Sequence, residues 1–298
     1  MSGEADLLNQ LSNALESRAR EANSLVVAVR NPSHQHVTGL LWSAEAVITS
    51  EQAVGERNEY EIVTAAGDAT SARIAGRDPG TNLLVLRPER DLSPGPKIRG
   101  EAHAGALALA LGATVEGSVT ARLGVIHSVG PQWCSRAGGR IEQRIALDIR
   151  LGRTEEGGPV LDSNGALLGM STSGPPGEAL TIPYATIERI VPQLLRDGRV
   201  TRGWLGVGLR PVAVPDALQD AAGQAAGMMV MSIVEGGPAA SAGVLAGDIL
   251  LTVNGASARS MRRLAAQLDE ASVGRKVDLR LIRGGAVLSL EASVAARP

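Results

Sequence analysis

This sequence has a single cysteine, no phenylalanine and no long apolar run. Cys134 is the only cysteine among 298 residues, so no disulfide can form within one chain. Phenylalanine is absent altogether. No segment approaches the roughly 20 apolar residues of a membrane helix, which predicts no membrane span. The net charge of −2 argues against nonspecific binding to nucleic acid or to a membrane surface.

The N-terminal segment, residues 1–22, also lacks an apolar core flanked by basic residues, and it is therefore no secretory signal. We predict a cytoplasmic protein, and an exported location only if the natural chain carries an upstream signal. Leucines recur at helical spacing in this segment and predict an amphipathic helix over about residues 4–21: Leu7, Leu8, Leu11 and Leu15. We interpret the apolar side of this helix as a cap over the β structure that follows, with a subunit contact as the alternative.

Short apolar runs dominate from Ser24 onward. They are separated by Asn-Pro, Gly and Gly-Asp turn signals at the spacing expected of a β-barrel. A Pro/Gly-rich connection at residues 91–100 divides them into two sets. A helical period then follows over 187–195 and ends at the glycine signal Asp197-Gly198. Pro192 within that period predicts a kink or two short helices. The length allows about two domains.

Residues 152–169 (GRTEEGGPVLDSNGALLG) predict a loop that leads into a β-hairpin. This stretch resembles the Gly-Asn-Ser-Gly-Gly-Pro motif of trypsin-like proteases of the HtrA/Deg family. Gly157, Gly158 and Pro159 match the motif, and Glu156 stands at the position of the nucleophilic serine. The resemblance implies a mainly β protein, with a two-barrel chymotrypsin-like domain over 23–200.

Two further positions of the family's catalytic triad are also substituted. In VITSEQAV, Gln52 takes the place of the histidine, and in GRDPGTNLLVL, Asn82 takes the place of the aspartate. An amide cannot accept the proton of a nucleophile, and Asn82 cannot stabilise an imidazolium. Thr154 stands where the family has a glycine of the oxyanion hole, and a β-branched residue resists unusual backbone angles. We therefore predict that the chain is a pseudoprotease and not an enzyme.

The C-terminal part, residues 201–298, resembles an α+β PDZ domain of the HtrA type in the segments TRGWLGVGLRPV and GMMVMSIVEGGPAASAGVLAGDILLTVNG. A PDZ groove takes a peptide as an added strand and holds its terminal carboxylate on backbone N–H groups of a tight loop. The resemblance assigns that loop to residues 204–207. The peptide-binding residues that it implies are Trp204, Leu205, Gly206 and Val207 in the loop, and Met261, Leu264 and Leu268 in the side-chain pocket. Residues that only form the core of a PDZ domain without a ligand are the alternative.

We expect an adaptor or scaffold that binds protein C-termini or extended peptides. The alternatives are a weakly active or non-standard endopeptidase, including one that uses Glu155 and Glu156, and a structural subunit that joins active relatives. Family trimers often use aromatic contacts near the N-terminus, and the absence of phenylalanine argues against a trimer. His34 and His36 lie in one loop without further ligands nearby, so we predict no metal site, and no cofactor is expected.

Overall fold

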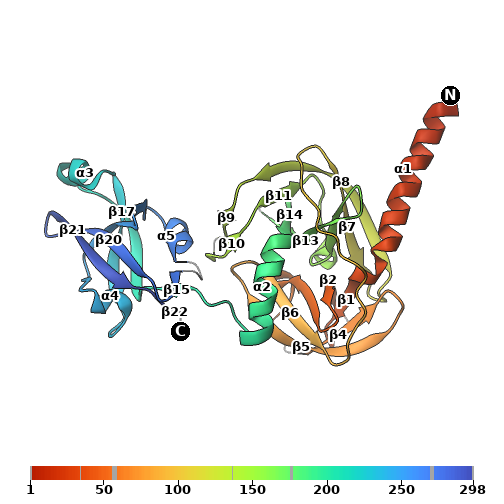
Figure 1. Ribbon diagram of the computed structural model, residues 1–298, viewed down its shortest axis with the longest axis horizontal. Helices are drawn as coiled ribbons and strands as arrows, with labels where there is room; N and C mark the ends of the chain where they lie inside the picture. Colours follow the sequence, from red (N-terminus) through yellow and green to blue (C-terminus); the bar gives the residue numbers. More distant parts are fainter. Residues whose placement is uncertain are drawn as a thin grey trace. The chain divides into compact units, whose positions relative to one another are not determined.

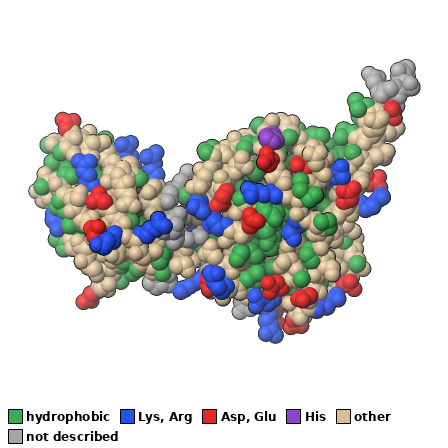
Figure 2. Space-filling model, in the orientation of Figure 1, with side chains coloured by type: hydrophobic (Ala, Val, Ile, Leu, Met, Phe, Trp, Pro, Cys, Tyr) green, Lys and Arg blue, Asp and Glu red, His purple; other side chains and the backbone are tan. Residues whose placement is uncertain are grey.

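The computed structural model describes residues 2–33, 35–55, 59–135, 137–174, 177–268 and 272–296; His34 lies outside them. The chain folds into two compact units. The first consists of residues 1–133 and 141–200, and the second of residues 134–140 and 201–298. Figure 2 shows basic and acidic side chains interspersed over the visible surface of each unit.

The first six strands form a closed barrel in the order β1-β2-β3-β6-β5-β4 (Figure 1). Alternate residues of a strand point to opposite faces, and both faces are apolar here. In β1, Val27 and Val29 fill the barrel interior, while Val26 and Ala28 pack into a core shared with the second barrel. The strands are β1 (Val26–Arg30), β2 (His36–Ser43), β3 (Ala46–Ser50), β4 (Glu59–Thr64), β5 (Ala69–Asp78) and β6 (Leu83–Pro88).

A second closed barrel follows in the order β11-β14-β13-β12-β7-β8. Ala108, Ala110 and Val160 belong to its own core, and their strand neighbours Leu109, Leu111 and Leu161 belong to the shared core. The strands are β7 (Leu107–Ala113), β8 (Val119–Gly130), β11 (Arg144–Leu147), β12 (Pro159–Asp162), β13 (Leu167–Ser173) and β14 (Ala179–Pro183), with the short pair β9 (Trp133–Cys134) and β10 (Arg140–Ile141) beside them in the sequence. The predicted two-barrel fold is confirmed.

The described part of the first unit contains the α-helices α1 and α2. In α2 (Tyr184–Asp197), Ile187, Ile190 and Leu194 are fully buried. Pro192 lies within this single helix, so the chain does not split into two helices there. The helix ends at Gly198, which is left-handed with φ of 71° and donates its N–H to the Leu194 carbonyl.

The N-terminal helix α1 (Ser2–Glu21) differs from the predicted cap. Among the described side chains of α1, Leu15 and Ala19, near its C-terminal end, pack against the core, and the helix contacts β7 of the second barrel. Leu7 and Leu8 are each 68% exposed and Leu11 is 40% exposed. The apolar side of α1 is thus mostly uncovered, and its role as a subunit contact stays a prediction.

The second unit contains a sheet in the order β16-β17-β18-β20-β21, so β16 is an edge strand. Leu205, Met228, Leu264 and Leu281 are among the buried residues of its core. Its elements are β15 (Gly203–Trp204), β16 (Val207–Ala213), α3 (Asp216–Ala222), β17 (Ala226–Ile233), α4 (Pro238–Ser241), β18 (Ile249–Val253), β19 (Ala256–Ser257), α5 (Met261–Gln267), β20 (Lys276–Arg283), β21 (Ala286–Ser293) and β22 (Ala295–Ala296), as labelled in part in Figure 1. This is the α+β unit expected of a PDZ domain.

A buried ion pair ties the start of β18 to β20 in the second unit. The Asp248 side chain is 2% exposed and accepts hydrogen bonds from Arg283 Nε at 2.8 Å, from Arg283 Nη2 at 2.6 Å and from the Leu245 N–H at 2.8 Å. Burial acts to raise the pKa of Asp248, but the hydrogen bonds from Arg283 and Leu245 outweigh it and hold that pKa below its ordinary value.

Asp248→Asn is expected to lower the free energy of unfolding of the second unit by about 2 kcal/mol at pH 7, because it weakens buried, charge-assisted hydrogen bonds. A lowered folded-state pKa contributes stability above the unfolded pKa, and that stability is lost as the pH falls through the folded value. The difference between wild type and variant should therefore shrink below about pH 4. Hydrogen exchange of the β17 and β18 amides measures this difference in the free energy of unfolding. Asp278→Asn, at an exposed position of β20, is the control. A stability difference between wild type and Asp248→Asn that persists at low pH would contradict a lowered pKa of Asp248.

Candidate functional site

The three residues predicted at the triad positions, Gln52, Asn82 and Glu156, converge at the junction of the two barrels. Gln52 lies in the 3-10 turn η2 (Glu51–Ala53) directly after β3, and Glu156 lies between the turn η3 (Arg153–Glu155) and β12. Asn82 ends the β5–β6 loop with a left-handed φ of 58°, which asparagine tolerates better than most residues. Its side-chain oxygen accepts the Gln52 backbone N–H at 2.8 Å. Buried Asp78 holds the loop through the N–H groups of Gly80 and Thr81.

Glu156 is the acceptor at the centre of this cluster. Its side chain is 6% exposed, and Oε2 accepts from Ser50 Oγ and Gln52 Nε2, each at 3.0 Å. Its other oxygen, Oε1, accepts from Ser173 Oγ at 2.8 Å, and the Ser173 N–H lies 3.3 Å from Oε2. A buried carboxylate is stable only when such donors replace water, and here they come from both barrels.

The two amides complete the network. Gln52 Nε2 also donates to Thr172 Oγ1 at 3.0 Å and to the Ser173 carbonyl at 2.9 Å. Asn82 Nδ2 donates to Ser50 Oγ at 3.0 Å and to Thr172 Oγ1 at 2.6 Å. Sequence reasoning missed Ser50, Thr172 and Ser173. Ser50 precedes Gln52 by two residues, but only the barrel closure brings the Ser-Thr-Ser end of β13 to it.

The chemistry that this cluster allows follows from its side chains. In the described part of the chain, no histidine forms a hydrogen bond with a member of the cluster. The amides of Gln52 and Asn82 donate hydrogen bonds but do not accept protons from a nucleophile. Two serine hydroxyls donate to the Glu156 carboxylate. Ser50 is fully buried and Ser173 is half-buried, so Ser173 with Glu156 is the more accessible pair of a nucleophile and a potential proton acceptor.

The neighbouring residues of η3 point elsewhere. Thr154 is exposed, and its carbonyl accepts a hydrogen bond from Thr38 Oγ1 at 2.7 Å. Glu155 accepts from Arg122 Nε and from the Gly152 N–H, at 2.6 and 2.7 Å. Adjacent Glu155 and Glu156 therefore serve different partners and do not form a carboxylate pair.

In the second unit, the predicted peptide-binding residues lie together around one pocket of about 190 Å³. Leu205, Leu264 and Leu268 are buried in the core and form its base, whereas Met261 is 53% exposed. Gly206 is left-handed, with φ of 75°, so a side chain there is strained. The pocket is lined by Trp204, Leu205, Gly206, Val207, Met261, Leu264 and Leu268, together with neighbouring residues.

The loop between β15 and β16 has free backbone donors. The N–H groups of Leu205 and Gly206 donate to no acceptor among the described residues, although the carbonyls of both accept hydrogen bonds from Ala239 and Val234. The loop is thus anchored through its carbonyls, while its N–H groups are available to an anion. Edge strand β16 follows directly, where an extended peptide can add to the sheet.

Comparisons with known proteins agree with these two units. Residues 37–170 match the family model of the trypsin-like peptidase domain, and residues 203–294 match that of the PDZ domain. The chain is similar to a solved structure of an HtrA-type protease, AlgW with a decapeptide. The two share 25% identity and a TM-score of 0.74, and the match covers 95% of this chain and 99% of that one. The chain therefore has a trypsin-like serine protease domain of the HtrA/DegP type and a PDZ domain. A serine endoprotease from Yersinia pestis, at 24% identity and a TM-score of 0.74 over 95% of this chain and 98% of that one, shares the fold.

Curated relatives of this HtrA-type protein include two that are named probable periplasmic serine endoproteases, DegP-like. The Brucella suis protein is 30% identical over 85% of this chain, and the Bartonella henselae protein is 31% identical over 80%. The chain spans 50% and 48% of their lengths, about half in each case.

These names correct two predictions. The prediction that the chain is not an enzyme is wrong, because its relatives are named serine endoproteases. That inference rested on Gln52, Asn82 and Glu156 at the triad positions and on Thr154 at the oxyanion-hole position. The prediction of a cytoplasmic location is also wrong, because the relatives are named periplasmic. That inference rested on the absence from residues 1–22 of an apolar core flanked by basic residues. No helix in the described part of the chain is long and apolar enough to cross a membrane.

Proposed function

We propose that this HtrA-type protein binds extended polypeptides by their free C-termini at the second unit, and that it acts as an adaptor or scaffold for them. The observation that carries the proposal is that the N–H groups of Leu205 and Gly206 have no acceptor among the described residues and lie beside an apolar pocket and an edge strand. A carboxylate needs such donors, and a terminal apolar side chain needs such a pocket. The similar AlgW structure was solved with a decapeptide, which supports the assignment.

Peptides that end in a free carboxylate are expected to bind at least about tenfold more tightly than their amidated forms, because hydrogen bonds to a charged group are the stronger ones. Fluorescence polarisation of a library of labelled peptides with varied C-terminal residues measures this. Gly206→Ala is expected to weaken binding by about tenfold, since it strains the loop that carries the N–H groups. Gly223→Ala is the matched control, because Gly223 is also left-handed, with φ of 70°, but caps α3 away from the pocket. Equal binding of acids and amides would refute the proposal.

A non-standard endopeptidase activity is the second candidate, favoured by the Ser173–Glu156 contact of 2.8 Å and by the relatives' names. In this reaction the Ser173 oxygen bonds to the peptide carbonyl carbon while its proton passes to Glu156 Oε1. The proton then goes to the leaving amine as the C–N bond breaks, and water hydrolyses the acyl ester.

Wild-type protein is expected to cleave unfolded casein slowly, and Ser173→Ala should abolish cleavage. Glu156→Gln should lower the rate by about 100-fold or more, because it removes the proton acceptor. Ser163→Ala, at an exposed turn position, is the control for a serine outside the cluster. Gel electrophoresis with time measures the cleavage. Cleavage that survives Ser173→Ala would exclude Ser173 as the nucleophile.

For location, the relatives' names favour the periplasm or another exported compartment. Detection of the native protein in the osmotic-shock fraction of its cells would support this, and recovery only with cytoplasmic markers would contradict it.

A further inference from the structure

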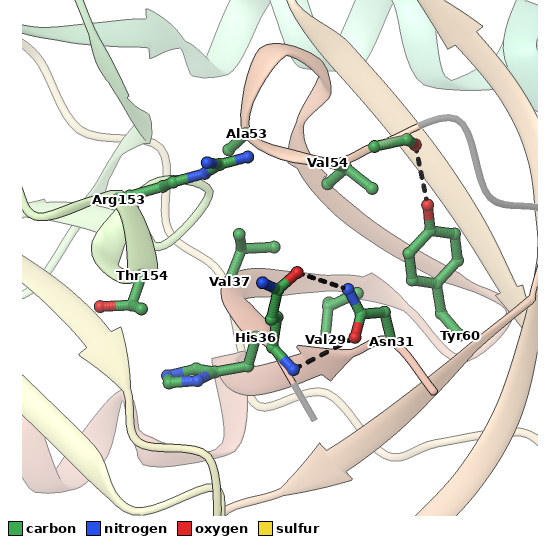
Figure 3. Close-up of a pocket in the computed structure, with 11 residues that line it drawn as sticks. Val29, Asn31, His36, Val37, Ala53, Val54, Tyr60, Arg153 and Thr154 are labelled. Carbon is green, nitrogen blue, oxygen red and sulfur yellow. Dashed lines mark hydrogen bonds between the residues drawn. The ribbon is translucent and has the colours of Figure 1, made fainter. Parts of the chain in front are cut away.

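A cavity of about 340 Å³ lies in the first unit beside η2 and η3, and Gln52, Asn82 and Glu156 are not among the described residues that line it (Figure 3). It is formed by three segments that are far apart in the sequence: the β1–β2 turn, η2 with the start of β4, and η3. Its volume falls within the range of small-molecule sites in proteins. The lining residues are Val29, Asn31, Gln35, His36, Val37, Ala53, Val54, Gly55, Tyr60, Arg153 and Thr154.

The inner part of the cavity is apolar and held in place. Val29, Val37 and Ala53 belong to the interior of the first barrel, and Val54 packs against them. Tyr60 is 6% exposed and donates its hydroxyl to the Gly55 carbonyl at 3.0 Å, which fixes one wall. This surface suits a branched apolar group rather than a polar one.

The rim is polar and also ordered. Asn31 Nδ2 donates to Gln35 Oε1 at 3.2 Å, and the Gln35 N–H donates to Asn31 Oδ1 at 3.1 Å, so the β1–β2 turn is closed on itself (Figure 3). His36 Nε2 lies 3.0 Å from the Ala113 carbonyl oxygen. On the η3 side, Thr38 Oγ1 bonds to the Thr154 carbonyl and accepts the Ala113 N–H. A ligand would thus enter a preformed site.

Arg153 supplies the charge of the site. Its guanidinium reaches from η3 toward Ala53 at the end of η2 (Figure 3). Arg153 is exposed and forms no ion pair with any described residue, in contrast to Arg122 nearby in the fold, which is paired with Glu155. No carboxylate is among the described residues that line the cavity. A planar guanidinium without a partner matches a carboxylate in geometry and in charge.

We propose that this cavity binds a carboxylate that is joined to a branched apolar group, with the apolar group against Val29, Val37 and Val54 and the carboxylate at Arg153. Two sources offer this chemistry: a free N-acylated amino acid, or the last residue of a polypeptide. The site is separate from the carboxylate site proposed at the β15–β16 loop, and it does not depend on that proposal.

The test uses the full ¹⁵N-labelled chain and three probes: N-acetyl-leucine, N-acetyl-leucinamide, and a hexapeptide that ends in a free leucine carboxylate. Amide chemical shifts at Val37, Val54 and Gly55 report this cavity, and shifts at Gly206 and Val207 report the other site. We expect N-acetyl-leucine to shift the backbone amide signals of the cavity. N-acetyl-leucinamide, which has no carboxylate, should bind at least about tenfold more weakly. Shifts from the hexapeptide alone assign the site to chain ends, and shifts from both probes assign it to the shared chemistry.

Three variants complete the test. Arg153→Gln should weaken binding of N-acetyl-leucine by about tenfold or more. Thr154→Trp should abolish it by filling the entrance from an exposed position. Arg150→Gln, which removes an exposed arginine that does not line the cavity, should leave it unchanged. The proposal is overturned if no acid probe shifts the cavity amides at millimolar concentration. It is also overturned if the Arg153→Gln variant binds N-acetyl-leucine as tightly as the wild type does and the wild type binds N-acetyl-leucinamide as tightly as N-acetyl-leucine.

Discussion

Gly158→Ala is expected to destabilise the first unit by about 4 kcal/mol, the largest effect that we predict for one methyl group. A Cβ at Gly158 would lie 1.8 Å from the Leu111 carbonyl oxygen and 3.0 Å from Thr38 Cγ2. The first of these atoms is backbone in β7, so no rotamer change relieves the overlap. Either β12 or β7 must shift, and both are paired strands of the second barrel.

Urea unfolding of the first unit, followed by hydrogen exchange of β7 and β12 amides, measures the effect of Gly158→Ala. Gly55→Ala is the matched control, because a methyl group on Gly55 would have no heavy atom of the described residues within 4 Å. It should change the free energy of unfolding by no more than about 0.5 kcal/mol. Equal stability of the two variants would show that the backbone yields at Gly158.

The Gly157-Gly158-Pro159 segment has a packing requirement for glycine that does not depend on which residue stands at position 156. Gly157 is left-handed, with φ of 94°, and a Cβ there would lie 2.2 Å from the Thr38 carbonyl oxygen. The two glycines thus let the segment before β12 pass close to β2 and β7. The motif by which the family is recognised is required by packing between the barrels.

Glu156→Ala is expected to lower the free energy of unfolding of the first unit by about 3 kcal/mol. The change leaves the side-chain donors of Ser50, Gln52 and Ser173 without their buried acceptor, and each such loss costs about 1 kcal/mol or more. The variant also opens a cavity where the carboxylate stood. Thermal and urea unfolding of the full chain measure the loss.

Glu156→Gln is the control for shape in this experiment. It keeps one acceptor oxygen and nearly the same volume, so it should cost less than Glu156→Ala, about 1 to 2 kcal/mol. If Glu156→Ala unfolds at the same temperature as the wild type, the cluster does not stabilise the junction of the barrels. The comparison separates a structural role of Glu156 from its proposed role as a proton acceptor, which Glu156→Gln removes.

Local sequence patterns predicted much of the fold. Alternating or continuous apolar runs between turn residues placed the barrel strands, and Gly198 ended α2 as expected, because both signals act over a few residues. The motif around Gly157 identified the family. Pro192 does not divide α2 into two short helices, and Ile190, Val191 and Leu194 around it are buried in the core. The apolar side of α1 does not cover the barrel as expected, since Leu7, Leu8 and Leu11 are exposed. Amphipathicity indicates that one face of a helix is apolar, but it does not indicate which surface packs against that face.

The sequence by itself determined the fold class and the family, and it predicts that Gln52, Asn82 and Glu156 stand at the triad positions. Only the tertiary structure decided what those residues contact. Ser50, Thr172 and Ser173 join Glu156 because the ends of β3 and β13 meet where the two barrels pack, and that contact spans more than 100 residues of sequence. The cavity at Arg153 arises in the same way, from η3 lying against η2 and the β1–β2 turn. Such sites depend on closure of both barrels, and no local pattern encodes it.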